Sequence, residues 1–184
     1  MEFREVVMKR RAVRRFEEGG VDPAVIEGIA RLAQRTPSAG FSQGQRLVIV
    51  TDPEARRRGA RICGEEMYAD LGMGPWISEC AAQFVPCVSE EIYHRRYQEP
   101  DKVDDDGREI EWPVPYWFVD IGATTMVIML AAVDAGLGGL AGLDQPVLLG
   151  APLRELPAEQ LRVERLGRLG VARRGHRILV LPRD

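Results

Sequence analysis

One long apolar segment, Asp120–Ala135, constrains the fold more than any other part of the sequence, and the glycine-rich run Gly136–Gly142 follows it. Ala, Met, Ile and Leu surround most of the segment, so it predicts a helix that is buried on nearly all sides. Gly136 predicts the C-cap of this helix. The uncharged run Ile121–Val133 is shorter than the roughly 20 residues needed to cross a bilayer. We therefore expect a soluble, cytoplasmic protein with no membrane partner.

Length and composition favour a single globular domain over residues 1–184. A chain of this size, 45% hydrophobic and 29% charged, buries enough surface to fold without disulfides or a metal. A net charge of −3 gives no basic excess, so we expect no nucleic-acid partner. Three cysteines without C-x-x-C spacing and two histidines disfavour a metal site. Because the first 15 residues lack an apolar core, we expect no signal peptide.

Cap and turn signals divide the remaining chain into short helices and strands. Asp22-Pro23 and Asp52-Pro53 each combine an N-cap carboxylate with a proline at the first helical position. Residues 89–117 are predicted to be an irregular, lid-like segment. Since helices and strands do not alternate strictly, we predict an α+β fold with a mostly antiparallel or mixed central sheet flanked by helices. The predicted strands cover residues 47–50, 81–88, 163–171 and 178–181.

Four arginines stand within six positions near the N-terminus: Arg10, Arg11, Arg14 and Arg15. Their guanidinium groups repel one another unless an anion or acidic side chains lie among them. If this segment is not helical, Arg10 and Arg14 can reach one phosphate. A solvated basic edge paired with Glu17 and Glu18 is the alternative.

Two further segments are candidates for ligand binding. In TPSAGFSQG, residues 36–44, the hydroxyls of Ser38 and Ser42, the amide of Gln43 and the backbone suit a ribityl or phosphate group. An ordinary polar loop is the alternative. Residues 136–141 contain G-x-G-x-x-A, but the glycines follow a predicted helix, which excludes a dinucleotide-binding turn. The bare backbone there still allows close approach of a flat ligand.

Aromatic and charged residues alternate in the lid-like segment. Such a pattern suits a lid over a stacked ligand, and it equally suits a dimer interface. The candidate lid residues are Tyr93, Tyr97, Trp112 and Trp117.

RRAVRRF, PSAGFSQ and an apolar helix ending in AGLGGLAG occur in this order between Phe3 and Gly142. This arrangement resembles the FMN-dependent nitroreductase family, whose pattern is roughly R-R-S-x-R-x-F, P-S-x-x-N-x-Q-P-W and A-x-x-x-G-L-G. The resemblance implies a nitroreductase-like fold and an intertwined homodimer with FMN at its interface. It also implies hydride transfer from NAD(P)H to a small electron-poor acceptor, such as a nitroaromatic compound or a quinone.

The resemblance also implies roles for individual residues. Arg10 would bind the FMN phosphate, Arg14 would lie at the pyrimidine edge of the flavin, and Arg11 lies between them. The backbone of Ala141 and Gly142 would face flavin N5, and no catalytic side chain is implied. The remaining implied contacts are Ala12, Gln43, Pro37, Ser38 and Ala39, the last three from the partner chain, and Arg177 at the phosphate, with Arg173 and Arg174 as rivals.

The sequence departs from the family pattern at a few positions close to the implied cofactor. Ala12 replaces a serine, Phe41 replaces an asparagine, and Gly44-Gln45 replaces Pro-Trp. Ala12 and Phe41 keep one alternative open, a non-catalytic flavin-binding protein. The lid-like segment 89–117 keeps a second one open, a dedicated relative such as a reductive dehalogenase or a flavin-processing enzyme, because a long insert there can select a substrate.

Overall fold

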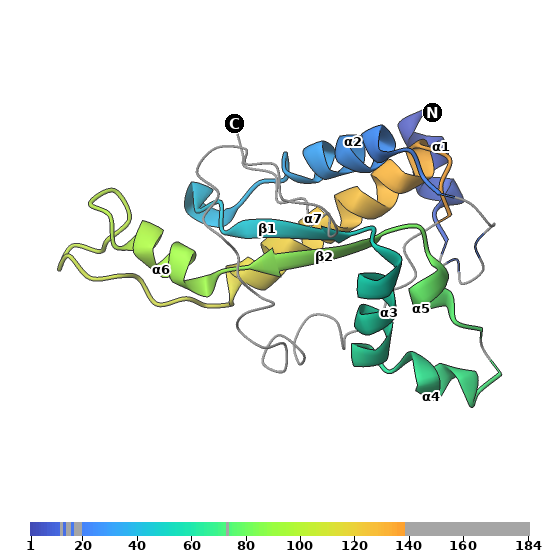
Figure 1. Cartoon of the computed structure of the whole chain (residues 1–184). Coiled ribbons are helices and arrows are strands. Elements are labelled where there is room, and N and C mark those ends of the chain that lie inside the picture. Colours follow the sequence, from blue (N-terminus) through green and yellow to red (C-terminus); the bar gives the residue numbers. More distant parts are fainter. Residues whose placement is uncertain (12, 14–15, 17–19, 73, 139–184) are drawn as a thin grey trace.

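A two-stranded antiparallel sheet and the long helix α7 (Tyr116–Asp134) form the centre of the protein (Figure 1). The computed structural model describes residues 1–11, 13, 16, 20–72 and 74–138. Strand β1 (Gln45–Val50) pairs with β2 (Gln83–Val88), and Gln45 lies opposite Val88. Helices and an antiparallel strand pair confirm the predicted α+β class. The strands predicted at 163–171 and 178–181 lie outside the described residues.

Two helices confirm the cap signals in the sequence. They are α2 (Pro23–Ala33) and α3 (Pro53–Ile62), which follow the N-terminal helix α1 (Phe3–Lys9). The Asp22 carboxylate accepts a 2.8 Å hydrogen bond from the Ala24 amide, and Asp52 accepts one of 2.8 Å from Ala55. Each aspartate thus satisfies an amide that has no partner within its own helix.

The main core lies between α2, the strand pair and α7. Ile29, Ile49 and Ile128 are at most 3% exposed, and one of them comes from each of these three layers. Burial of side chains of this size is worth about 1.5–3 kcal/mol each. This core fixes the position of α7 relative to the loop that precedes β1.

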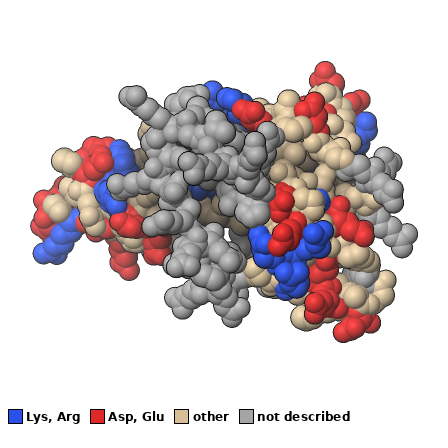
Figure 2. Space-filling model, in the orientation of Figure 1, with Lys and Arg blue, Asp and Glu red and all other residues tan. Residues whose placement is uncertain are grey.

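A smaller cluster joins α3 to two short helices, α4 (Glu65–Ala69) and α5 (Trp76–Glu79). The Glu65 carboxylate accepts hydrogen bonds from the amides of Ile77, at 2.6 Å, and Ser78, at 2.9 Å, and so caps α5. Figure 2 shows Lys and Arg side chains gathered over α3, beside acidic side chains over α4. The sequence of α3 contains four arginines, Arg56, Arg57, Arg58 and Arg61.

Helix α7 differs from its predicted form in two ways. It begins at Tyr116, directly after Pro115, rather than at Asp120. It is also not buried on nearly all sides, because Phe118, Val119 and Met126 are 56%, 59% and 47% exposed. At its C-terminus the prediction is confirmed. Gly136 has φ +76°, and the Leu137 amide donates to the Ala132 carbonyl at 2.9 Å, which completes a Schellman cap.

At 19 residues, α7 is long and apolar enough to cross a membrane, which corrects the expectation based on the shorter uncharged run. Half of this stretch is buried inside the protein, where it packs on α2 and both strands. A buried core helix meets the same criteria of length and composition, so the helix is weak evidence for a membrane span.

The prediction that residues 89–117 are irregular is wrong for their first part. Helix α6 (Glu90–Tyr97) follows β2 and extends away from the centre of the protein (Figure 1). Within α6, Arg95 pairs with Glu91 at 2.6 Å and His94 lies 3.4 Å from Glu90. These i,i+4 pairs are readable in the sequence and favour a helix. Further along, Val103 and Glu109 form an isolated antiparallel bridge.

Candidate functional site

The loop between α2 and β1 is the best-defined part of the candidate site. It contains the 3-10 turn η1 (Ala39–Phe41). The Ser42 hydroxyl donates to the Ala39 carbonyl at 2.6 Å, and the Ser38 hydroxyl accepts from the Gln43 amide at 2.8 Å. Both serines, which the sequence offered as ligand contacts, therefore also shape their own loop. Pro37 is exposed, while Ser38 and Ala39 are half-buried.

Asp120 of α7 binds this loop from the side of the protein core. One of its carboxylate oxygens, Oδ2, accepts hydrogen bonds from the Ala39 amide at 2.8 Å and from the Tyr93 hydroxyl at 2.7 Å. Asp120 is only 9% exposed. One turn further along α7, the Thr124 hydroxyl lies 2.8 Å from that of Thr36. Sequence reasoning missed this anchor, although an aspartate inside an otherwise apolar helix is a readable signal.

The loop backbone is held in conformations that are rare outside glycine. Phe41 has φ +58° and Gln43 has φ +55°, next to Gly40 at φ +58°. Each left-handed residue other than glycine costs of order 1 kcal/mol, so such geometry persists only where surrounding contacts impose it. Phe41 is also 74% exposed, so its own side chain is not what holds the turn.

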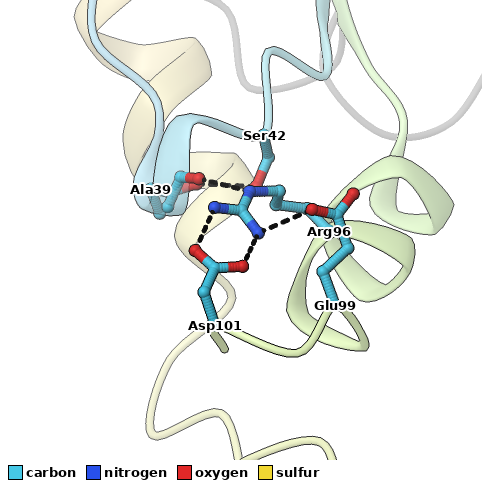
Figure 3. Close-up of polar contacts among 6 residues, drawn as sticks. Ala39, Ser42, Arg96, Glu99 and Asp101 are labelled. Carbon is cyan, nitrogen blue, oxygen red and sulfur yellow. Dashed lines mark hydrogen bonds and ion pairs between the residues drawn. The ribbon is translucent and has the colours of Figure 1, made fainter. Parts of the chain in front are cut away.

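Helix α6 supplies contacts to the outer side of the loop (Figure 3). Arg96 Nε donates to the Gly40 carbonyl at 3.0 Å, and the two terminal nitrogens of Arg96 each lie 2.7 Å from an Asp101 oxygen. The hydrogen bonds from this guanidinium lower the pKa of Asp101 to about 2. Sequence reasoning missed Arg96 as well, because its partner in the loop is a backbone carbonyl.

The four candidate lid residues belong to one aromatic cluster. The Trp112 ring centroid lies 4.3 Å from that of Tyr97, 5.7 Å from Trp117 and 6.5 Å from Tyr93. Tyr93 is 0% exposed and Trp117 is 9% exposed, so both pack inside the chain. Tyr97 and Trp112 are half-buried and keep part of their surface open. A stacking role for the cluster stays a prediction, and the half-buried pair has the accessible surface for it.

Glu109 links helix α6 to the residues that precede α7, through contacts with His94 and Trp112. His94 Nδ1 and Trp112 Nε1 each lie 2.5 Å from Glu109 Oε1. The hydrogen bond with Glu109 raises the pKa of His94, with a smaller contribution from Glu90. Burial would raise the pKa of Glu109, but the hydrogen bonds from Trp112 and His94 outweigh it and the pKa lies below its usual value.

The cysteines are not part of this site. Burial raises the pKa of Cys63 and of Cys80 to about 11 and also raises that of Cys87. All three are free thiols, so no disulfide joins them. Among the described residues, no group of three or more His, Cys, Asp or Glu side chains is placed to hold a metal ion.

Only part of the predicted arginine and glycine motifs falls within the described residues. Arg10 follows α1 directly and is half-exposed, and Arg11 is exposed. A Cβ atom added to Gly138, just after α7, would lie 3.3 Å from Val13. The N-terminal motif and the segment after α7 therefore meet, as a shared site requires. The candidates outside the described residues are Ala12, Arg14, Ala141, Gly142, Arg173, Arg174 and Arg177.

Comparison with known proteins now identifies the family. The model of the nitroreductase family matches residues 7–141, which is most of the chain. The chain belongs to the nitroreductase family. This match confirms the resemblance found in the three sequence motifs. No curated protein matches the sequence.

Solved structures support the nitroreductase fold. A nitroreductase family protein from Streptococcus pneumoniae has a TM-score of 0.55 at 18% identity, over 82% of this chain and 84% of its own. Nitroreductase A from Vibrio parahaemolyticus has a TM-score of 0.55 at 23% identity, over 74% of this chain and 52% of its own. The NADPH:FMN oxidoreductase from Vibrio harveyi has a TM-score of 0.55 at 22% identity, over 75% of this chain and 54% of its own. The match thus spans about half the length of the two Vibrio proteins.

Proposed function

We propose that this nitroreductase family member is an FMN-dependent oxidoreductase that passes hydride from NADH or NADPH to a small electron-poor acceptor. Family membership supports the reaction class. The Vibrio harveyi neighbour, an NADPH:FMN oxidoreductase whose structure contains NAD⁺, supports the choice of cofactor and donor. Nitroaromatic compounds and quinones are the acceptors to test first.

One observation carries the proposal: the arginines beside α1 have no acidic partner among the described residues. Arg10 is half-exposed, Arg11 is exposed, and neither takes part in the ion pairs of the described chain. A guanidinium group without a carboxylate partner is available to a phosphate, with which it can form two parallel charge-assisted hydrogen bonds. These residues therefore fit the phosphate end of FMN.

FMN, when bound, would supply the two-electron redox chemistry. The chain would bind and orient it. Arg10 would hold the phosphate, and Arg14 would place positive charge at the pyrimidine edge, where negative charge develops during reduction. The backbone of Ala141 and Gly142 would approach the N5 edge, with Arg177 as a further phosphate contact.

We also propose that the functional form is a homodimer. Phe118, Val119 and Met126 expose an apolar face of α7, and Phe3 and Met8 of the neighbouring helix α1 are 72% and 74% exposed. A second copy would cover these side chains in an interface of about 2,000 Å² or more. Pro37, Ser38 and Ala39, anchored by Asp120, would then contact the cofactor bound mainly by the partner.

A dedicated relative of the family is the second candidate. The exposed, left-handed Phe41 stands where the family pattern has asparagine, and α6 adds an ordered structure beside it. Both features favour selection of one particular acceptor. A single favoured compound in an acceptor panel, with nitroaromatics and quinones reduced poorly, would support this candidate.

The test of the proposed function is cofactor identification followed by assay of one matched pair of variants. Heat should release FMN from the purified protein, and the protein should oxidise NADH or NADPH in the presence of an acceptor. Arg10→Ala should weaken FMN binding about 30- to 1,000-fold, since loss of a partly buried charged contact costs about 2–4 kcal/mol. Arg15→Ala serves as the matched control and should leave FMN bound.

Three results would count against the proposal. A protein with bound FMN that oxidises neither nucleotide would be a non-catalytic flavin-binding protein. A purified protein without flavin that takes up none when FMN is added would exclude the cofactor. If Arg10→Ala binds FMN as tightly as the parent does, the arginine cluster is only a solvated basic edge.

A further inference from the structure

Arg96 joins the segment after β2 to the loop that precedes β1. Its Nε atom donates to the Gly40 carbonyl at 3.0 Å, and its terminal nitrogens hold Asp101 at 2.7 Å twice and Glu99 at 3.0 Å (Figure 3). Gly40 lies 56 positions earlier in the chain. Three of the four other N–H donors of the guanidinium thus bond to two acids, and Nε is directed at one backbone carbonyl.

The same turn meets α6 at a second point. A Cβ atom at Gly40 would lie 2.5 Å from Tyr97 Cε2, so the glycine backbone packs directly against this ring. Gly40 has φ +58°, where glycine is the least strained residue. Two neighbouring residues of α6 therefore contact Gly40: Arg96 binds its carbonyl oxygen, and the Tyr97 ring packs against its Cα.

The contribution of Arg96 to global stability should be small. Its acidic partners, Glu99 and Asp101, are 58% and 59% exposed, and exposed ion pairs add little to the free energy of unfolding. Neither Arg96 nor Asp101 belongs to the main core. What the contact does impose is the direction of the Gly40 carbonyl, next to the left-handed backbone of Phe41.

We propose that Arg96 is a positioning residue of the cofactor loop, which it holds in the shape that Ser38 and Ala39 present to FMN. The inference rests on the proposed function, because it assumes that this loop contacts the cofactor. Asp120 fixes the loop from the core through the Ala39 amide, and Arg96 fixes it from α6 through the carbonyl of the next residue, Gly40. Loss of the outer contact should leave the left-handed Phe41 free to relax.

The test compares Arg96→Ala with Arg95→Ala. Arg95 is a matched control because it lies on the same helix, carries the same charge and pairs with the exposed Glu91 at 2.6 Å. Arg96→Ala should weaken FMN binding about tenfold, the value expected for one hydrogen bond from a charged donor. Arg95→Ala should bind FMN like the parent.

A second readout needs no cofactor. In the apoprotein, the Phe41 and Ser42 amides donate within the turn to Ser38 and Ala39 at 2.9 and 3.0 Å. Their hydrogen exchange should become faster in Arg96→Ala, while the amides of β1 keep the parent rates. Arg96→Lys should restore part of both effects, because one ammonium group can reach Gly40 or Asp101 but cannot reproduce the fork.

The outcomes separate the inference from the proposed function. If the parent binds no FMN, the proposed function is wrong and the inference fails with it. If the parent binds FMN and Arg96→Ala has the same affinity and the same loop exchange, only the inference is wrong. Should Arg96→Ala unfold, Asp101→Asn repeats the comparison in a milder form, and parent-like affinity and loop exchange there also contradict the inference.

Discussion

The hydroxyl group of Tyr93 in α6 donates a 2.7 Å hydrogen bond to the carboxylate of Asp120 in α7. The same carboxylate oxygen accepts from the Ala39 amide, so one buried acid joins three elements. Tyr93 is 0% exposed and Asp120 is 9% exposed. Because both side chains are buried, water cannot fully replace the Tyr93 hydroxyl as a hydrogen-bond donor to Asp120.

Tyr93→Phe should therefore lower the free energy of unfolding by about 1–3 kcal/mol, the cost of leaving a buried acceptor without one of its partners. Denaturant titration measures this directly. Tyr116→Phe is the matched control, because within the described part of the chain the Tyr116 hydroxyl has no hydrogen bond, and its change should be close to zero. Equal small changes in both variants would show that the buried contact contributes nothing.

Gly40→Ala should destabilise the protein by at least about 1 kcal/mol, because alanine is strained at φ +58° and its Cβ would lie 2.5 Å from Tyr97. Gly28→Ala in α2 offers the opposite case. Apart from the backbone of α2 itself and the two neighbouring residues, no atom lies within 4 Å of a Cβ there, and alanine in a helix interior is favoured by about 0.5–1 kcal/mol. The two midpoints should move in opposite directions in chemical unfolding. A Gly40→Ala variant as stable as the parent would refute the close packing of this turn.

The contact between His94 and Glu109 should make stability depend on pH above the ordinary pKa of histidine. The hydrogen bond with Glu109 raises the pKa of His94 above 6.5 in the folded protein. The resulting stabilisation is fully present below the unfolded-state value and is lost as pH rises through the raised folded-state pKa. The unfolding midpoint should therefore fall as the pH rises from the ordinary histidine value of 6.5 through the raised folded-state pKa. In His94→Gln the unfolding midpoint should depend less on pH over this range. An unchanged dependence would show that other titrating groups cause it.

Met126→Glu should disrupt the proposed homodimer. Met126 is 47% exposed in the middle of α7, and a carboxylate at the centre of an apolar interface loses its solvation without gaining a partner. Light scattering should give a dimer for the parent and a shift toward monomer for the variant. Met67→Glu, at a 72% exposed position on α4, is the control and should remain dimeric. A parent that is a stable monomer at micromolar concentration would end the homodimer proposal.

Local signals predicted much of the fold. Asp22-Pro23 and Asp52-Pro53 marked the starts of α2 and α3, since an N-cap carboxylate and a first-turn proline act within a few residues of themselves. Gly136 marked the C-terminal end of α7 for the same reason, since a helix cap also acts within a few residues. The order of the arginine, PSAGFSQ and glycine-rich motifs was sufficient to indicate the family, which the match over residues 7–141 confirms.

Interactions between distant residues decided what the sequence left open. The sequence alone determined the α+β class, the family and the segments that carry the candidate site, because these depend on local propensity and on motif order. Only the tertiary structure showed that α7 has an exposed apolar face, that Asp120 and Arg96 hold the loop from opposite sides, and that Tyr93 is buried. Arg96 and Gly40 are 56 positions apart, and a hydrogen bond to a backbone carbonyl leaves no trace in the identity of the accepting residue. Such contacts become visible only when packing brings the two segments together.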